Sequence, residues 1–371
     1  MSTSLLQWLI TLDQRQGSDL YLTFGAPPML RGDDGMAPLE ETPLDDAAIA
    51  AIIADLTTAA QRAAFERDSE LNMALDLGRA GRFRINILRQ RQHPALVIRR
   101  IATRIPTFAD LHLPPLLGEL CREKRGLILV VGGTGSGKST SMAAMLDDRN
   151  SADSGHIITI EDPIEYLHDH KRCLITQREV GMDTRDYPTA LKNALRQKPD
   201  LILIGEIRDS DTMDLALSVA ETGHLCLATL HANNANQAIE RVLSFFETPS
   251  HPQILRALSQ NLRAILSQRL VRTQSGGRRA ALEILLNQGL IRELIRKGEV
   301  KDMKAVMADN RAHGMQTFDQ ALLDLWREGV IDEDTALAEA DNAADLRVAL
   351  QQTRLGGGGG LTGVDTSGLS F

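Results

Sequence analysis

The stretch LILVVGGTGSGKST, residues 127–140, decides the fold expected for this chain. It opens with a short apolar run, partly β-branched, which is too short for a helix of its own and typical of a buried strand. A glycine-rich turn follows, and Met142 then begins a segment of helix formers, MAAML. The sequence therefore predicts a strand, a loop and a helix in this order, with the spacing GxxxxGK[ST] at the junction.

This loop is predicted to bind the phosphates of ATP together with Mg²⁺. Glycines let backbone N–H groups turn inward around a phosphate chain, and the following helix presents the positive end of its dipole there. The Lys138 ammonium can reach the β- and γ-phosphates, and the Ser139 hydroxyl can hold Mg²⁺. A chance match is the alternative, and the flanking strand and helix argue against it. The expected nucleotide-binding residues are Gly132, Gly133, Thr134, Gly135, Ser136, Gly137, Lys138, Ser139 and Thr140.

The composition limits the class of protein. The chain has 371 residues, of which 43% are hydrophobic, and this is enough for two or three domains. Its net charge of -8 argues against nucleic acid as the main partner. Three isolated cysteines fit a reduced cytoplasmic protein and predict no zinc site. Neither a signal peptide nor an apolar run that could span a bilayer is evident, so membrane association is expected only through partners.

Four segments are expected along the chain. Residues 1–102 combine alternating strands with alanine-rich helices and predict a small α+β domain with an antiparallel sheet. Residues 103–115 contain three prolines and are the expected linker. Residues 116–355 alternate strands and helices, which is typical of a parallel sheet, and end in a helical part. Residues 356–371 begin with a glycine run and are expected to be a disordered tail.

Hydrophobic periodicity gives the individual elements. The expected strands are 19–24, 71–77, 81–90, 95–101, 127–131, 157–160, 201–204, 225–230 and 280–286. The expected helices are 5–12, two within 44–65, 116–125, 187–197, 211–221, 317–326 and 334–351. Apart from the strand at 280–286, residues 254–318 are expected to be mostly helical.

Acidic residues and a histidine follow three of the expected parallel strands. Glu161 and Glu165 follow the first of these strands, Glu206 the second and His231 the third. The carboxyl ends of parallel strands line one crevice, so these groups can converge on the phosphates. A nucleotide hydrolase needs one acidic group to activate water and another to support Mg²⁺. Singly, Glu161 could be a surface residue and His231 a structural one, but their joint position at strand ends favours a functional set.

Four motifs resemble those of a known family. The phosphate loop, ITIEDPIEY at 158–166, LILIGEIRD at 201–209 and AETGHLCLATLHANNA at 220–235 are similar to the Walker A, Asp, Walker B and His boxes of the type II/IV secretion ATPases. Within that superfamily the chain resembles the pilus retraction (twitching motility) ATPases, the PilT and PilU group. The C-terminal segments LLNQGLIRELIRKGEVKDMKAVM and GMQTFDQALLDLW look closest to PilU-type members.

The resemblance implies a RecA-like P-loop core, a PAS-like N-terminal domain and a role for each matched residue. Glu165 is the implied water activator, with Glu161 as the second choice. Glu206 stands in the Walker B motif and would support Mg²⁺ and water. His224 and His231 are the His-box residues, with His224 expected at the nucleotide and His231 among the catalytic residues. Lys198, in RQKPD, departs from the usual RQDPD of the family, but it precedes the strand.

The resemblance also implies a ring of six subunits, with ATP bound where the N-terminal domain of one subunit meets the core of another. Several arginines crowd two adjacent strands of the small domain, and a solvated sheet face is the alternative explanation, which we prefer for Arg89, Arg91 and Arg100. Alternation places Arg82 and Arg84 on one face of their strand. The family position indicates Arg84 and Arg99 as the residues that reach the triphosphate of a neighbouring subunit.

The implied function is a hexameric cytoplasmic motor that drives type IV pilus retraction, as the PilU-type partner of a PilT-like paralogue. It would act at the inner membrane through the pilus platform protein. The alternatives are a pilus-assembly or type II secretion ATPase, a nucleotide-binding regulatory subunit and a DNA motor. The first of these usually has a longer N-terminus and a tetracysteine motif, which this sequence lacks, and residues 289–296 depart slightly from the AIRNLIRE segment of PilT.

Overall fold

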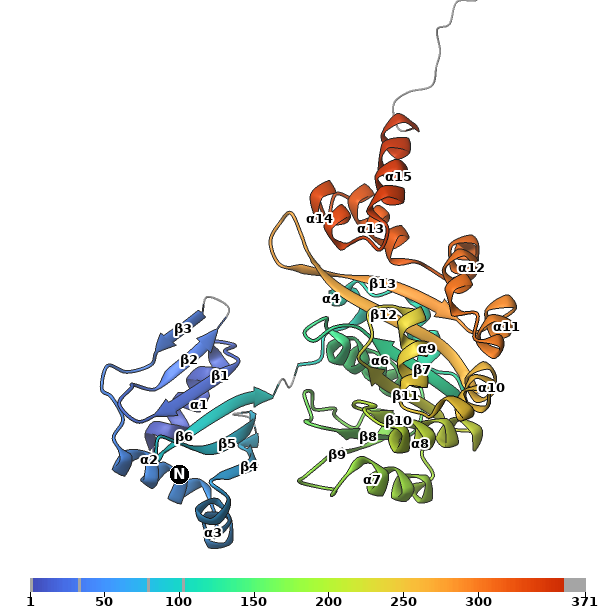
Figure 1. Cartoon of the computed structure of the whole chain (residues 1–371). Coiled ribbons are helices and arrows are strands. Elements are labelled where there is room, and N and C mark those ends of the chain that lie inside the picture. The colour runs from blue at the N-terminus through green and yellow to red at the C-terminus, as the bar shows by residue number, and fades with distance from the viewer. Residues whose placement is uncertain (1–2, 33–34, 79–80, 102–103, 357–371) are drawn as a thin grey trace, which may run out of the picture. The chain divides into compact units, whose positions relative to one another are not determined.

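The structure is a computed structural model that describes residues 3–32, 35–78, 81–101 and 104–356. It divides into two compact units (Figure 1). The N-terminal unit comprises Met1–Ile105 and Ile164–Asp169, and the C-terminal unit comprises Pro106–Pro163 and His170–Phe371. The sequence placed the boundary in a linker at 103–115 and gave 164–169 to the core. The prediction of a disordered tail falls, from residue 357 on, outside the described residues.

The N-terminal unit is an antiparallel sheet with helices. Its strands follow the order β3-β2-β1-β6-β5-β4. Alternate residues of β5, Phe83, Ile85 and Ile87, are fully buried and form the core with the helices. The helices are α1 (Thr3–Gln14), α2 (Asp46–Leu56) and α3 (Ala59–Asp68). The strands are β1 (Asp19–Thr23), β2 (Met29–Gly32), β3 (Gly35–Pro38), β4 (Glu70–Asp76), β5 (Arg82–Gln90) and β6 (His93–Ile101). This confirms the expected small α+β unit.

The C-terminal unit is built on a mostly parallel sheet, as predicted. Its strand order is β13-β12-β7-β11-β10-β8-β9, and only β13 runs antiparallel to its described neighbour. The strands are β7 (Gly126–Val131), β8 (Gly155–Glu161), β9 (Cys173–Glu179), β10 (Leu201–Ile204), β11 (Leu225–Leu230), β12 (Leu262–Arg272) and β13 (Arg278–Leu286). Strand β7 lies inside the sheet, between β12 and β11, and every one of its residues is buried.

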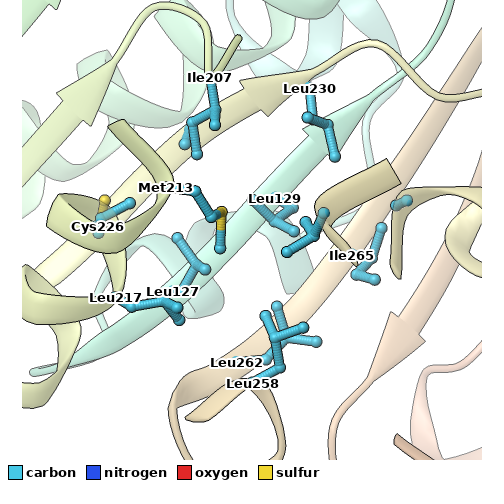
Figure 2. Packing of buried hydrophobic residues seen from close by; sticks show 14 of the residues in the cluster. Leu127, Leu129, Ile207, Met213, Leu217, Cys226, Leu230, Leu258, Leu262 and Ile265 are labelled. Atoms are coloured by element: carbon cyan, nitrogen blue, oxygen red, sulfur yellow. The ribbon is translucent and has the colours of Figure 1, made fainter. Parts of the chain in front are cut away.

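Helices cover both faces of this sheet and give it two apolar cores. On one face, Leu127 and Leu129 of β7 pack with Met213 and Leu217 of α8 (Figure 2). On the other face, Ile128 and its neighbours pack against α5 and α6. The helices of this part are α4 (Phe108–Leu111), α5 (Leu116–Cys121), α6 (Lys138–Ala152), α7 (Tyr187–Ala194), α8 (Ser210–Glu221), α9 (Ala235–Ser244) and α10 (His251–Asn261).

The C-terminal helices form a further apolar cluster against the β12/β13 hairpin, with Val271 and Ala281 contributed by the strands. In Figure 1 the last three helices gather beside that hairpin. The helices are α11 (Leu290–Lys297), α12 (Met303–Asp309), α13 (Phe318–Arg327), α14 (Glu333–Glu339) and α15 (Ala343–Gly356). No helix in the described ranges is sufficiently long and apolar to cross a bilayer.

Several element predictions were wrong in detail, and β2, β3 and α9 were not expected at all. Residues 262–272 form strand β12, not a helix: their apolar spacing is helical, but pairing with β7 and β13 determines the conformation. Strand β9 was missed because it is an edge strand that carries several polar residues. The single helix expected at 334–351 is two helices, which are separated at residues 340–342.

Candidate nucleotide-binding site

The predicted phosphate loop joins the carboxyl end of β7 to the first turn of α6. Three of its glycines, Gly132, Gly135 and Gly137, have positive φ angles of 154°, 75° and 85°. A Cβ atom at Gly132 would lie 2.5 Å from the Gln268 carbonyl oxygen and 2.5 Å from the Ser136 hydroxyl. The loop conformation therefore requires glycine, whereas Gly133 has open space where a side chain would stand.

The polar groups of the loop fit a phosphate chain. Lys138 lies at the start of α6, and its ammonium donates to the carbonyl oxygens of Gly132 and Gly133 at 2.8 and 2.9 Å. The Ser136 hydroxyl is buried and has no hydrogen-bond partner among the described residues. Ser139 and Thr140 follow in the first helical turn, where backbone N–H groups remain available for an anion. The residues present therefore fit the triphosphate that the sequence predicts.

Gln268 of β12 supports this loop and was not found from the sequence. It is 3% exposed, and its Oε1 accepts a 2.8 Å hydrogen bond from the Ser141 hydroxyl of α6. Its Nε2 atom would lie 2.8 Å from a Cβ atom at Gly137. Because residues 262–272 were predicted to be helical, no sequence signal placed Gln268 beside the loop. It packs under the loop from the neighbouring strand and fixes its shape.

Two pockets meet at the loop and share Gly133 and Asn233. The larger has a volume of about 550 Å³ and extends from residues 133–136 across the β12/β13 hairpin to α14. The smaller, of about 450 Å³, extends to His231 and to Glu240 and Arg241 of α9. Both volumes lie in the range of small-molecule sites. The loop thus has space for a nucleotide on one side and for the reacting end of the phosphate chain on the other.

The structure brings Glu206 and His231 together. Glu206 follows β10, His231 follows β11, and Nε2 of the histidine lies 3.0 Å from Oε1 of the glutamate. The other carboxylate oxygen of Glu206 accepts from Arg208, whose Nε donates at 2.7 Å, and Arg208 also reaches Asp162 at 3.3 Å. The hydrogen bond to Glu206 raises the pKa of the Arg208 guanidinium. Arg208 was not singled out from the sequence, although it lies in the quoted Walker B segment.

Glu161 lies at the end of β8, in the same unit. Its Oε1 accepts a 2.6 Å hydrogen bond from Thr159 and a 3.3 Å hydrogen bond from Gln177. Its register partner on β9 is Glu179, which is 1% exposed. Glu161 is thus half-buried and hydrogen-bonded at the carboxyl edge of the sheet, as its position after the strand predicts.

Glu165, in contrast, belongs to the N-terminal unit. The segment Ile164–Asp169 is grouped there, together with both arginines that the sequence selected. Arg84 and Arg99 are direct register partners on β5 and β6. The Arg99 Nε donates to Asp19 at 2.8 Å, and this hydrogen bond is the main cause that raises the pKa of Arg99, to which Glu165 adds a weaker contribution. Glu165, Arg84 and Arg99 therefore belong to one unit, separate from the phosphate loop.

His224 is not at the phosphate loop of its own unit, so its expected place at the nucleotide stays a prediction. It precedes β11, and its carbonyl oxygen accepts from Gly126, the first residue of β7. The loop follows the opposite end of β7. A strand of this length at about 3.3 Å per residue separates the two sites by roughly 20 Å. The two His-box residues, His224 and His231, thus flank opposite ends of β11.

Comparisons with known proteins agree with this architecture. The family described as Type II/IV secretion system protein matches residues 30–334. The Type IV pilus ATPase PilU of Pseudomonas aeruginosa is 50% identical, covering 91% of this chain and 89% of its own length. The Type IV pilus retraction ATPase PilT of the same organism is 40% identical, covering 90% and 97%.

A solved structure shows the same fold. The crystal structure of the pilus retraction motor PilT with bound ADP has a TM-score of 0.86 at 38% identity, covering 93% of this chain and 99% of that one. The predicted RecA-like core with a smaller N-terminal domain is therefore confirmed, and so is the predicted likeness to PilT and PilU. With the family match over residues 30–334, these relatives show that the chain belongs to the type II/IV secretion system protein family.

Proposed function

We propose that this chain is an ATP hydrolase that drives type IV pilus retraction, in the manner of a PilU-type motor. The observation that carries the proposal is the phosphate loop with the Glu206–His231 pair at the adjacent strand ends, in a chain 50% identical to PilU. The printed names of the relatives supply the pilus and the ATPase activity. Twitching motility is the expected cellular role.

The residues of the core would act on the phosphate chain. Lys138 leaves the loop carbonyls and binds the β- and γ-phosphates. The Ser139 hydroxyl and, through water, Glu206 would hold Mg²⁺, which compensates the charge of the phosphates when bound. His231, held by Glu206, would sense the γ-phosphate from the smaller pocket. Glu165 or Glu161 would accept the proton of the attacking water.

We propose that the site is completed by a second subunit in a hexameric ring. The support is the division of candidate residues between the two units, with the loop in one and Arg84, Arg99 and Glu165 in the other. An arginine delivered across an interface stabilises charge on the γ-phosphoryl oxygens and links hydrolysis to movement of the units. Activity should then depend on assembly.

The proposed partners are further copies of this chain, a PilT-like paralogue and the pilus platform protein, with no role for nucleic acid. The motor would be cytoplasmic and reach the inner membrane only through these partners. In the proposed domain organisation, an N-terminal domain is followed by a linker, an ATPase domain and a tail at 356–371 that is dispensable for ATP hydrolysis. A regulatory subunit without useful turnover, or an assembly ATPase, is the competing outcome of the experiment below.

The experiment is deletion of this gene alone and together with that of its PilT-like paralogue, scored for twitching and for the number of surface pili. Loss of twitching with retained or increased pili is expected, restored by the wild-type chain and not by Lys138→Ala. Loss of pili from the single mutant would instead identify an assembly ATPase. Full complementation by Lys138→Ala would identify a regulatory role without turnover.

A further inference from the structure

The larger pocket has a second wall that the phosphate loop does not explain. Its loop side is formed by residues 133–136, and its opposite side by Thr335, Ala338 and Glu339 of α14. Arg272 and Arg278, register partners on the β12/β13 hairpin, also line it. If the phosphates lie at the loop, the ribose and base of the nucleotide occupy the part of the pocket that α14 closes.

A cluster of charges holds the end of α14 to the sheet. Arg269 donates through Nη1 to the Glu339 carbonyl oxygen at 2.6 Å and through Nη2 to Oδ1 of Asp341 at 2.6 Å. Lys304 of α12 donates to Asp341 at 3.0 Å and to Asp319 of α13 at 3.3 Å. The same Asp319 accepts from the backbone N–H of Asp341 at 2.8 Å. One cluster therefore ties three C-terminal segments to β12.

The carboxylates of the cluster are largely shielded from solvent, and two cations, Arg269 and Lys304, compensate their charge. The side chain of Asp341 is 12% exposed and that of Asp319 is 18% exposed. Burial opposes ionisation of Asp341, but hydrogen bonds from Lys304 and Arg269 outweigh it and hold its pKa below the usual value. Burial likewise opposes the charge on Lys304, yet both carboxylates keep its pKa above the usual value. Removal of either cation would leave shielded carboxylates with less compensation.

The cluster and the phosphate loop are supported by adjacent residues of β12. Arg269 follows Gln268, which packs beneath Gly137 and accepts from Ser141. Neighbouring residues of one strand thus support the loop wall and the α14 wall. The guanidinium of Arg269 additionally lies 4.0 Å from the ring centre of Phe318, in the apolar cluster of the C-terminal helices.

We propose that Lys304 and Asp341 are positioning residues that latch α14 over the ribose and base of the bound adenine nucleotide and so limit the release of ADP. The inference rests on the proposed ATPase function. The occupant of this end of the pocket is the nucleoside, because the phosphate loop fixes the other end of the same molecule. When the hydrogen bonds of the cluster break, α14 moves away from the pocket, and the nucleoside loses the wall that Thr335, Ala338 and Glu339 form.

The test compares ADP with inorganic tripolyphosphate. Both ligands contact the phosphate loop, but only ADP has a nucleoside that α14 can cover. Dissociation of a fluorescent ADP is measured by stopped flow, and affinity for inorganic tripolyphosphate is measured by competition. Lys304→Met should release ADP about tenfold faster than wild type, as expected for loss of a charged hydrogen bond in the closed state. Affinity for tripolyphosphate should stay within about twofold, since it contacts only the loop. Asp341→Asn should act in the same direction and serves if Lys304→Met does not fold.

Arg296→Met is the matched control, because its 2.6 Å pair with Glu293 lies within α11 and involves neither α14 nor the residues that line the larger pocket. It should leave ADP release unchanged. Equal ADP release in wild type and both folded latch variants would overturn the latch, as would a parallel loss of ADP and tripolyphosphate binding. Failure of the wild-type chain to bind either ligand would instead refute the proposed ATPase function.

Discussion

The two units of this chain differ in how their candidate functional residues are held. In the C-terminal unit the phosphate loop, Glu206 and His231 follow neighbouring strands of one buried sheet, so the backbone pairing sets their spacing. In the N-terminal unit, Arg84 is half-buried and Arg99 exposed on an antiparallel sheet, and Glu165 is grouped with them. The candidate residues of the core are therefore positioned by one sheet, whereas Arg84, Arg99 and Glu165 belong to the other unit.

The largest effect is expected at the phosphate loop. Lys138→Ala should remove measurable ATP hydrolysis, because the charge on the transferring phosphoryl group loses its ammonium. The measurement is phosphate release with Mg²⁺, with the fold checked by circular dichroism. Lys124→Ala, a change in the turn before β7, is the control and should retain activity. Normal turnover of a folded Lys138→Ala protein would remove the basis for an ATPase.

The second effect tests the N-terminal unit. Arg84→Ala should bind ATP and assemble normally, yet hydrolyse about a thousandfold more slowly if this residue acts as an arginine finger. Arg99→Ala is not used here, because it would deprive Asp19, which is 3% exposed, of its 2.8 Å ion pair. Arg89→Ala, on the same strand but paired with Glu66, is the control. A normal rate for Arg84→Ala would restrict the reacting residues to the core.

The third effect compares carboxylates from the two units. Glu206→Gln and Glu165→Gln should each leave ATP bound but slow turnover, by about a hundredfold, since each keeps size and removes a charge that acts on water or Mg²⁺. ATP affinity and single-turnover rate are measured for both, with Glu221→Gln at the end of α8 as a control. If Glu161→Gln were slow and Glu165→Gln normal, the water-activating role would pass to Glu161 and to the core unit.

The smallest effect is expected at the C-terminus. Truncation after Leu355 should leave the rate of ATP hydrolysis within about twofold of wild type, because a glycine run gains too little from packing to offset its ordering entropy. The rate per subunit and the melting temperature are compared with those of the full chain. A large loss of hydrolysis would show that the tail contributes to the site. Loss of twitching alone would indicate that the tail contacts a partner.

The sequence predicted the core of the site because local chemistry determines it. The GxxxxGK[ST] spacing, the buried runs of β7, β10 and β11 and the polar residues after them can each be recognised without knowing what they pack against. The sequence did not predict the supports of the site, because these depend on strand pairing. Gln268 and Arg269 lie in a segment with helical spacing that becomes β12 between two other strands. The distance of His224 from the phosphate loop was not evident either, because the seven residues from His224 to His231 span the full length of β11.

The grouping of residues 164–169 with the N-terminal unit is a second feature that the local sequence pattern does not predict. The Asp-box segment follows β8 directly, and continuity with that strand favoured the core. The contacts assign it instead to the N-terminal unit, with Arg84 and Arg99. Because Glu165, Arg84 and Arg99 belong to a different unit from the phosphate loop, the proposed activity depends on assembly of the subunits into a ring.

Mixing two inactive variants tests the shared site most directly. Lys138→Ala supplies an intact N-terminal unit, Arg84→Ala supplies an intact phosphate loop, and each alone should be nearly inactive. In rings of randomly mixed subunits at equal amounts, about a quarter of the sites should combine both intact parts and regain hydrolysis. The account predicts that the rate of the mixture clearly exceeds the sum of its components. A mixture no faster than that sum, or full wild-type activity in a demonstrably monomeric sample, would contradict it.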